Sequence, residues 1–230
     1  MNKKHPRDLI LQTLREKSAM KQDVFAVTFE ALNGFKSAMK DTVDYLYKEM
    51  VNADKRIAIE YRSKSEFSAE MKIAGDTLIF QMHTNVFHFD KSHNLWNTSY
   101  VKEDPYRAYC GMINIYNFLS DSLKYNREND LGYLIGRIFI NKDKHFFVEG
   151  KRQLGFLYNN FANSVMDEKM IPAIVESSVL YCLDFDLLTP SYDTMKEVSV
   201  HEIQELSKMM VVTTGKRLGF KFQADTDSIQ

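Results

Sequence analysis

The sequence has few of the features that mark secreted or membrane-bound proteins. It contains 2 cysteines in 230 residues, and Cys110 and Cys182 lie far apart, each in apolar sequence. With no Cys-x-x-Cys pair, we expect two buried, reduced thiols rather than a structural disulfide. The first residues, MNKKHPRD, lack the apolar stretch of a signal peptide, and no run of about 18 apolar residues occurs. The sequence therefore predicts a cytoplasmic protein without a membrane partner.

Catalytic and cofactor-binding signatures are also missing. The sequence holds no GxxxxGK[ST] phosphate loop, no GxGxxG turn after a strand and no GxSxG nucleophile elbow. Paired carboxylates such as Asp184 and Asp186 follow an apolar helical run, a position typical of solvated side chains rather than of an acid and base pair. We expect no catalytic residue and no cofactor, and the sequence favours a protein that is not an enzyme.

No charge of one sign dominates the chain. It has 30 basic and 31 acidic residues, a formal net charge of −1, which does not favour nucleic acid or an anionic membrane as a partner. Residues 1–21 are locally basic, but their cations are dispersed, as in the solvated start of a helix. The hydrophobic share of 44% is ample for a core.

The strongest pattern is an apolar stripe between Ser18 and Val51. Its members recur every three or four residues, which is the period of one buried helical face: Phe25, Phe29, Leu32, Phe35, Met39, Val43, Leu46 and Met50. A helix of this length would be roughly 50 Å long. The Asn33-Gly34 pair could kink it, but the stripe keeps its phase through the pair. A shorter helix from Pro6 is expected to precede it.

Two groups of strands are predicted, separated by a helix. Residues 55–90 alternate apolar and polar side chains, which predicts a four-strand antiparallel meander that turns at Gly75-Asp76 and at Thr84-Asn85. Residues 131–158 predict a hairpin followed by a third strand, Gln153–Tyr158. Between the groups, Asp104-Pro105 is typical of a helix start, so we expect a helix over about 105–125.

The C-terminal part returns to a helical pattern. We expect helices within residues 164–210, including one opened by a capping box at Ser199–Glu202, a strand over Val211–Phe222 and a flexible tail at 224–230. The pattern as a whole predicts a single α+β domain over residues 1–223. In it, antiparallel sheet packs between the N-terminal long helix and the C-terminal helices. The two strand groups could form one sheet or two.

A metal site is one hypothesis for the polar face of the meander. If both predicted turns are two-residue loops, Gln81 lies opposite His88 and His83 lies diagonal to it, with strands about 4.8 Å apart. His83, His88 and Asp90 could then hold a divalent ion, whereas Glu70 would lie too far away. The alternative is a solvated sheet face with ordinary polar residues.

A second hypothesis rests on aromatic residues in the least regular part of the chain. Trp96, Tyr100, Tyr106 and Tyr109 lie near Arg107 and several lysines, and rings with interleaved cations can stack a planar ligand. The alternative is that these rings close the edge of the core.

For function, the sequence favours a non-catalytic cytoplasmic interaction or regulatory protein. The Ser18–Val51 stripe is close to a heptad, so the helix could pair with its twin in a homodimer, or a separate protein could bind it. The competing interpretation is that the stripe packs on the chain's own sheet. The alternative functions are a small-ligand sensor with its pocket beside Trp96, and a metal-dependent enzyme that uses the His83/His88 face.

Overall fold

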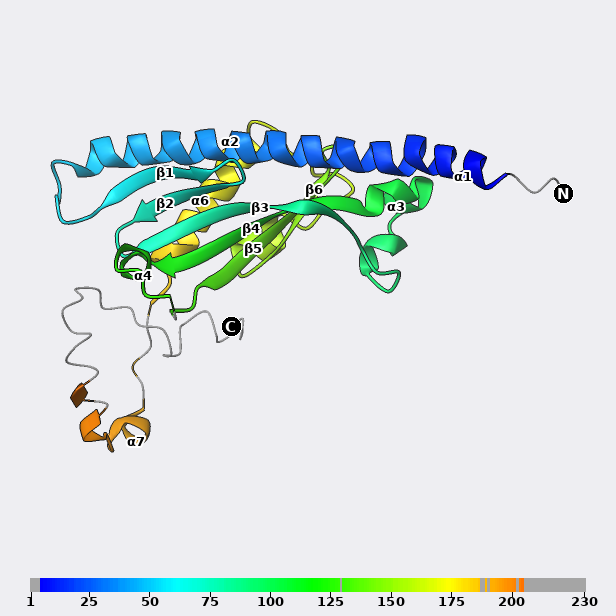
Figure 1. Cartoon of the computed structure of the whole chain (residues 1–230). Helices are drawn as coiled ribbons and strands as arrows, with labels where there is room; N and C mark the ends of the chain where they lie inside the picture. The colour runs from blue at the N-terminus through cyan, green and yellow to red at the C-terminus, as the bar shows by residue number, and fades with distance from the viewer. Residues whose placement is uncertain (1–4, 129, 187–188, 190, 202, 205–230) are drawn as a thin grey trace.

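A computed structural model gives the fold and describes residues 5–128, 130–186, 189, 191–201 and 203–204. Six strands form one antiparallel sheet in which each strand lies next to its neighbour in the chain (Figure 1). The predicted strand groups therefore join in a single sheet. Its strands are β1 (Ile59–Ser65), β2 (Ser68–Ile73), β3 (Asp76–His88), β4 (Tyr109–Leu119), β5 (Tyr133–Asn141) and β6 (Phe146–Gly150).

Helices precede, interrupt and follow the sheet, so the α+β class that the sequence predicts is confirmed. The long N-terminal helix consists of α1 (Pro6–Thr13), a π-helical segment η1 (Leu14–Ser18) and α2 (Ala19–Met50). The remaining helical elements are η2 (Asn94–Asn97), α3 (Ser99–Glu103), η3 (Pro105–Ala108), α4 (Ser120–Lys124), α5 (Gln153–Leu157), α6 (Met170–Leu183) and α7 (Tyr192–Met195). Val211–Phe222 and the tail at 224–230 lie outside the described residues, as does part of the Ser199–Glu202 capping box.

The helix predicted for Ser18–Val51 crosses the sheet and buries its apolar stripe there (Figure 1). Its fully buried members are Met20, Val24, Thr28, Ala31, Leu32, Phe35, Ala38, Met39 and Val43. The helix runs unbroken through Gly34. A Cβ on Gly34 would lie 2.7 Å from Cδ1 of Ile171, so this glycine lets α6 approach α2 and does not kink the helix.

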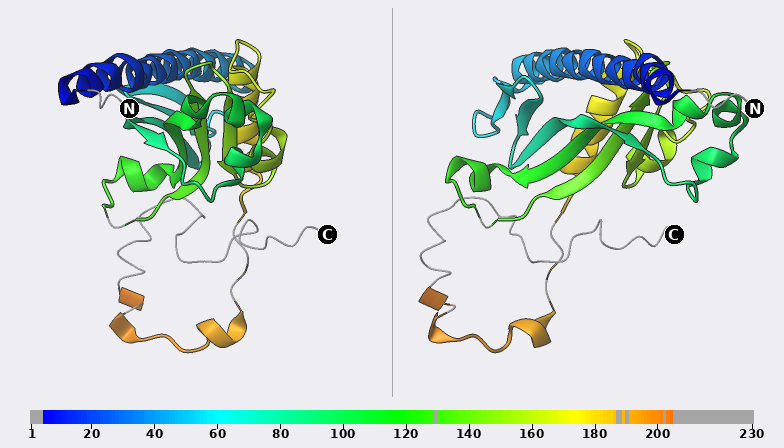
Figure 2. Two further views of the ribbon diagram at one scale, coloured as in Figure 1. Left: turned by 90° about the vertical axis from the view of Figure 1, so that its right-hand side faces the viewer. Right: turned by 45° about the vertical axis from the view of Figure 1, so that its right-hand side comes forward.

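One main hydrophobic core lies between the sheet and the two longest helices. α2 and α6 contact each other, and both bury side chains against the same face of the sheet (Figure 2). That face contributes Ala69, Met71, Leu78, Phe80, Ile113, Ile115, Ile138 and Val148. The sequence predicts a sheet packed between the N-terminal and the C-terminal helices. In the structure, these two helices share one face of the sheet and do not enclose it from both sides.

The prediction of a helix over about 105–125 is wrong. Residues 109–119 form strand β4, and only the ends of the predicted range are helical, as η3 and α4. β4 pairs with β3 on one side and β5 on the other, so much of both its faces is buried. A strand that is apolar on both faces also places apolar residues at helical spacing, which explains the misreading. Asp104 does act as a cap, since its side chain accepts a hydrogen bond from the Tyr106 N–H at 2.9 Å.

Three predicted turns or strands also differ from the structure. β3 continues past Thr84-Asn85 with an irregularity between His83 and Phe87, so the first group has three strands instead of four. Ile73 pairs with Asp76, which places the hairpin loop at Ala74-Gly75, one residue earlier than expected. Gln153–Tyr158 is not a strand but contains helix α5.

Helix α2 approaches the sheet closely at Gly111 in β4. A Cβ built on Gly111 would lie 2.1 Å from Oγ1 of Thr28, a distance that no real side chain tolerates. Thr28 is fully buried, and its hydroxyl donates a hydrogen bond to the Val24 carbonyl oxygen at 2.7 Å. The absence of a side chain at Gly111 therefore fixes how closely the helix crosses the sheet.

We predict that Gly111→Ala lowers the free energy of unfolding by at least about 2 kcal/mol, because the added methyl group forces the helix and the strand apart. Gly75→Ala is the matched control, since a Cβ at Gly75 meets no atom within 4 Å. Urea denaturation of both variants measures the difference. Equal stability of the two variants would contradict the tight crossing.

Candidate functional site

The segment between β3 and β4 packs on the face of the sheet opposite α2. Leu95, Val101 and Ala108 are buried there with Phe139 and Phe147 in a second, smaller core. Each short helix in the segment begins at a capping side chain: His93 for η2, Thr98 for α3 and Asp104 for η3. The predicted ligand residues therefore lie on a well-anchored segment, and some of them do close the edge of a core.

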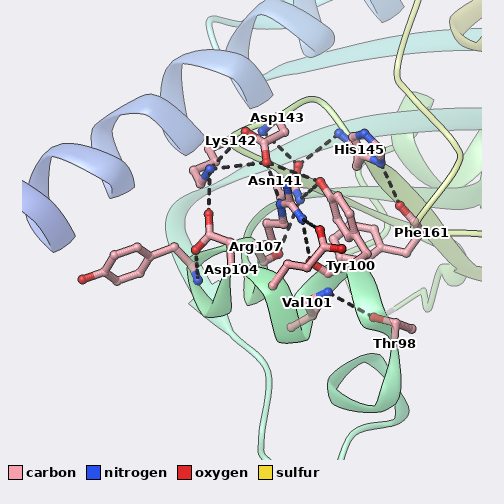
Figure 3. Close-up of polar contacts among 12 residues, drawn as sticks. Thr98, Tyr100, Val101, Asp104, Arg107, Asn141, Lys142, Asp143, His145 and Phe161 are labelled. Carbon is pink, nitrogen blue, oxygen red and sulfur yellow. Dashed lines mark hydrogen bonds and ion pairs between the residues drawn. The ribbon is translucent and has the colours of Figure 1, made fainter.

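Tyr100 and Arg107 are brought together by the turn between β5 and β6 (Figure 3). The Arg107 guanidinium lies 4.1 Å from the centroid of the Tyr100 ring and donates hydrogen bonds to the Tyr100 carbonyl oxygen at 2.7 Å and to Asp143 at 3.2 Å. Lys142 makes ion pairs with Asp143 at 3.1 Å and with Asp104 at 3.0 Å. Burial alone would raise the pKa of Asp143, but Lys142 and Arg107 outweigh it and hold that pKa below its usual value.

Asn141 is the centre of this network. Its side chain is fully buried, and its carbonyl oxygen accepts hydrogen bonds from the backbone N–H groups of Asp143 and His145, both at 3.0 Å. Its amide donates to the Tyr100 hydroxyl at 3.0 Å. Because these polar groups satisfy one another, the network anchors the segment to the sheet and offers no open ligand site. The sequence predicts the turn but not its contact with Tyr100, which lies 41 residues away from Asn141.

Trp96 and Tyr109 belong to a different group, which we call the Tyr109 cluster: Lys17, Lys21, His88, Lys91, Trp96 and Tyr109. The His88 ring lies between the two aromatic rings, with centroid distances of 4.4 Å to Tyr109 and 5.4 Å to Trp96. The indole N–H of Trp96 donates to the Phe89 carbonyl oxygen at 3.3 Å. Tyr106 lies beside the cluster, with its ring centroid 6.2 Å from that of Tyr109.

Three ammonium groups approach these rings from two directions. Lys17 in η1 and Lys21 in α2 lie over the Tyr109 ring, with Nζ to centroid distances of 5.5 and 5.8 Å. Lys91 lies over the Trp96 ring at 3.1 Å. Within the part of the chain that the structure describes, none of the three forms an ion pair with a carboxylate. The three lysines therefore bring positive charge to the cluster, where Asp90 is an acid close enough to act on His88.

The lysines also act on His88. Burial lowers the pKa of the His88 imidazole, and Lys91, Lys17 and Lys21 lower it further, whereas Asp90 acts in the opposite direction. His88 is therefore uncharged at neutral pH, and the positive charge of the cluster comes from the lysines alone.

The structure does not form the geometry on which the metal hypothesis depends. Gln81, His83 and His88 all lie on strand β3, so Gln81 does not lie opposite His88 and the two histidines are not on neighbouring strands. The His83 Nδ1 accepts a hydrogen bond from the Asn85 N–H at 3.0 Å, and Asp90 accepts hydrogen bonds from Ser92. Among the residues with described positions, no group of three His, Cys, Asp or Glu side chains could hold a metal ion.

Sequence reasoning finds Lys91 beside the aromatic residues but misses Lys17 and Lys21 as members of a site. Lys17 and Lys21 are four residues apart, a spacing that places two side chains on one face of a helix. The sequence gives no sign of which strand lies beneath that face. Cys110 and Cys182 are both buried, as expected for two thiols in apolar sequence, and burial raises the pKa of the Cys110 thiol.

Comparisons with protein-family models, with curated proteins and with solved structures find no significant match for this chain. Of the helices that the structure describes, none has both the length and the apolar character required to cross a membrane.

We predict that the stability of the folded protein decreases as the pH falls below about 6.5, the ordinary pKa of histidine. Because the pKa of His88 is lowered in the folded state, the unfolded chain binds more protons in this range. The neutral variant His88→Asn should lose less stability than the wild type between neutral and mildly acidic pH, as measured by urea denaturation. A pH dependence in His88→Asn equal to that of the wild type would contradict the lowered pKa of His88.

Proposed function

We propose that this chain is a non-catalytic cytoplasmic interaction protein that works as a homodimer through the N-terminal end of its long helix. The observation that carries the proposal is the exposure of α1. No residue of α1 is buried. Four aliphatic side chains of α1 and η1 are between 48% and 58% exposed: Leu9, Ile10, Leu11 and Leu14. Such a group of exposed aliphatic residues on one helix marks an interaction surface.

The expected dimer surface on Ser18–Val51 is not available for pairing, because the chain's own core takes up that stripe. The helix is longer than the sheet that it covers. α1 extends beyond the sheet at the N-terminal end of the molecule (Figure 1). The part of the long helix that lies beyond the sheet is thus α1, and not α2 (Figure 1).

The π-helical segment η1 separates the two surfaces. A π-helical turn accommodates an additional residue, which rotates the following face by roughly 100° relative to a regular helix. The apolar side chains before η1 therefore need not continue the stripe that begins at Met20. One continuous helix can in this way present one face to its own sheet and another face to a partner.

A second copy of the chain suits α1 because the charged residues beside its leucines can form ion pairs with those of the second copy. In an antiparallel pair with Leu11 of one helix opposite Leu14 of the other, Asp8 lies beside Arg15, and the two-fold axis repeats this contact. The paired segments are short, so the interface is smaller than the roughly 800 Å² per partner of a standard complex. The dimer is therefore expected to be weak and dependent on concentration.

The first test is sedimentation equilibrium over a wide range of protein concentration. The wild-type chain should change from monomer to dimer as the concentration rises, and Leu11→Glu should remain a monomer because it places a charge in the apolar contact. Leu180→Glu is the matched control, since Leu180 is 56% exposed on α6. A wild-type protein that stays monomeric throughout would refute the homodimer.

A charge exchange tests the antiparallel arrangement. Asp8→Arg should weaken the dimer by roughly threefold to tenfold, because it places like charges beside each other twice. Adding Arg15→Asp to the same chain reverses both partners and should restore the wild-type dissociation constant. Failure of the double variant to restore dimerisation would exclude this pairing of the helices.

A further inference from the structure

A groove lies beside the Tyr109 cluster, between α2 and the end of β3. It has a volume of about 610 Å³ and is bounded by Lys21, Gln22 and Phe25 on the helix and by residues 84–87 on the strand. This volume falls within the range of small-molecule sites, about 300–1,000 Å³. Lys21 belongs both to the groove and to the cluster, so the positive charge lies at one end of the groove.

The groove exists because, over the same stretch below the helix, β3 has more residues than β4. The register passes from His83 opposite Met112 to Phe87 opposite Cys110, so residues 84–86 of β3 stand opposite the single residue Gly111 of β4. The additional residues bulge out of the ladder. At Gly111 the helix is held close to the sheet by its contact with Thr28. The bulge and the helix thus form the two walls.

The walls combine apolar and hydrogen-bonding side chains. Phe25 and Val86 are half-buried and offer apolar surface, whereas Gln22, Thr84 and Asn85 are exposed and carry amide and hydroxyl groups. A planar ring with polar edges fits such a lining, because its faces need apolar contact and its edges need donors and acceptors.

The positive end of the groove is suited to a phosphate group. The three lysines lie against aromatic rings, which attract ammonium groups through their π-faces but leave the charge un-neutralised. Charge-assisted hydrogen bonds from such groups to phosphate oxygens are among the stronger polar contacts in proteins. The net charge of the whole chain is −1, so the site is a local concentration of positive charge.

We propose that the groove and the Tyr109 cluster together form a binding site for a mononucleotide, with its phosphate beside Lys17, Lys21 and Lys91 and its base between Phe25 and Val86. The local extent of the charge favours a single nucleotide over a nucleic acid strand, which is bound along an extended positive groove. The site is independent of the proposed homodimer, because neither Leu11 nor Leu14 belongs to it.

Titration with adenosine 5′-monophosphate tests the proposal, monitored by calorimetry and by the fluorescence of Trp96, the single tryptophan of the chain. The indole is a local reporter because the Lys91 ammonium lies on its face. The nucleotide should bind at least tenfold more tightly than either adenosine or inorganic phosphate. No binding of the nucleotide, or equal binding of inorganic phosphate, would overturn the proposal. Tighter binding of a single-stranded oligoadenylate, compared per nucleotide, would also overturn the proposal, because it would assign the surface to nucleic acid.

Two variants test the placement of the ligand. Lys17→Gln with Lys21→Gln should weaken binding of the nucleotide at least tenfold, whereas Lys40→Gln with Lys48→Gln, at exposed positions farther along the same helix, should leave it unchanged. Asn85→Glu places a carboxylate in the groove at an exposed position and should also weaken binding without affecting the fold. Wild-type affinity in both test variants would refute the site, and Leu11→Glu should retain binding even if the homodimer fails.

Discussion

The fold depends on the burial of one stripe of α2 against one face of the sheet. The stripe includes Leu32, Phe35 and Met39, each with no exposed side-chain surface. Between Thr28 and Gly111 the helix approaches the strand so closely that a side chain at Gly111 would not fit. The apolar surface that folding buries is concentrated between the helix and the sheet. The position of every strand beneath the helix therefore depends on this packing.

The same contact creates the two surfaces proposed to bind partners. Holding the helix down at Gly111 leaves the bulge of residues 84–86 standing beside it, which opens the groove next to Lys21. The helix then continues past the sheet through η1 into α1, where no residue is buried. The binding groove and the association surface are thus consecutive segments of one helix, separated by a change from α-helical to π-helical hydrogen bonding.

The sequence predicts the parts of the fold that depend on local pattern. The stripe of α2, the hairpin between β2 and β3 and the cap at Asp104 reflect short-range rules of period and capping. β4 was misread because a central strand is apolar on both faces, and the continuation of β3 was missed because Thr84-Asn85 resembles a turn. The Tyr109 cluster was predicted only in part, since Tyr109 and Lys17 lie 92 residues apart and meet only through the tertiary fold.

Hydrogen exchange measured at low and high protein concentration reports both parts of the long helix in one experiment. We predict that the amides of residues 20–43 are strongly protected at every concentration, since the chain's own sheet covers that face. The amides of residues 9–17 should exchange rapidly in dilute protein and become protected as the concentration rises. Strong protection of residues 9–17 in dilute protein, or rapid exchange there at every concentration, would contradict this prediction.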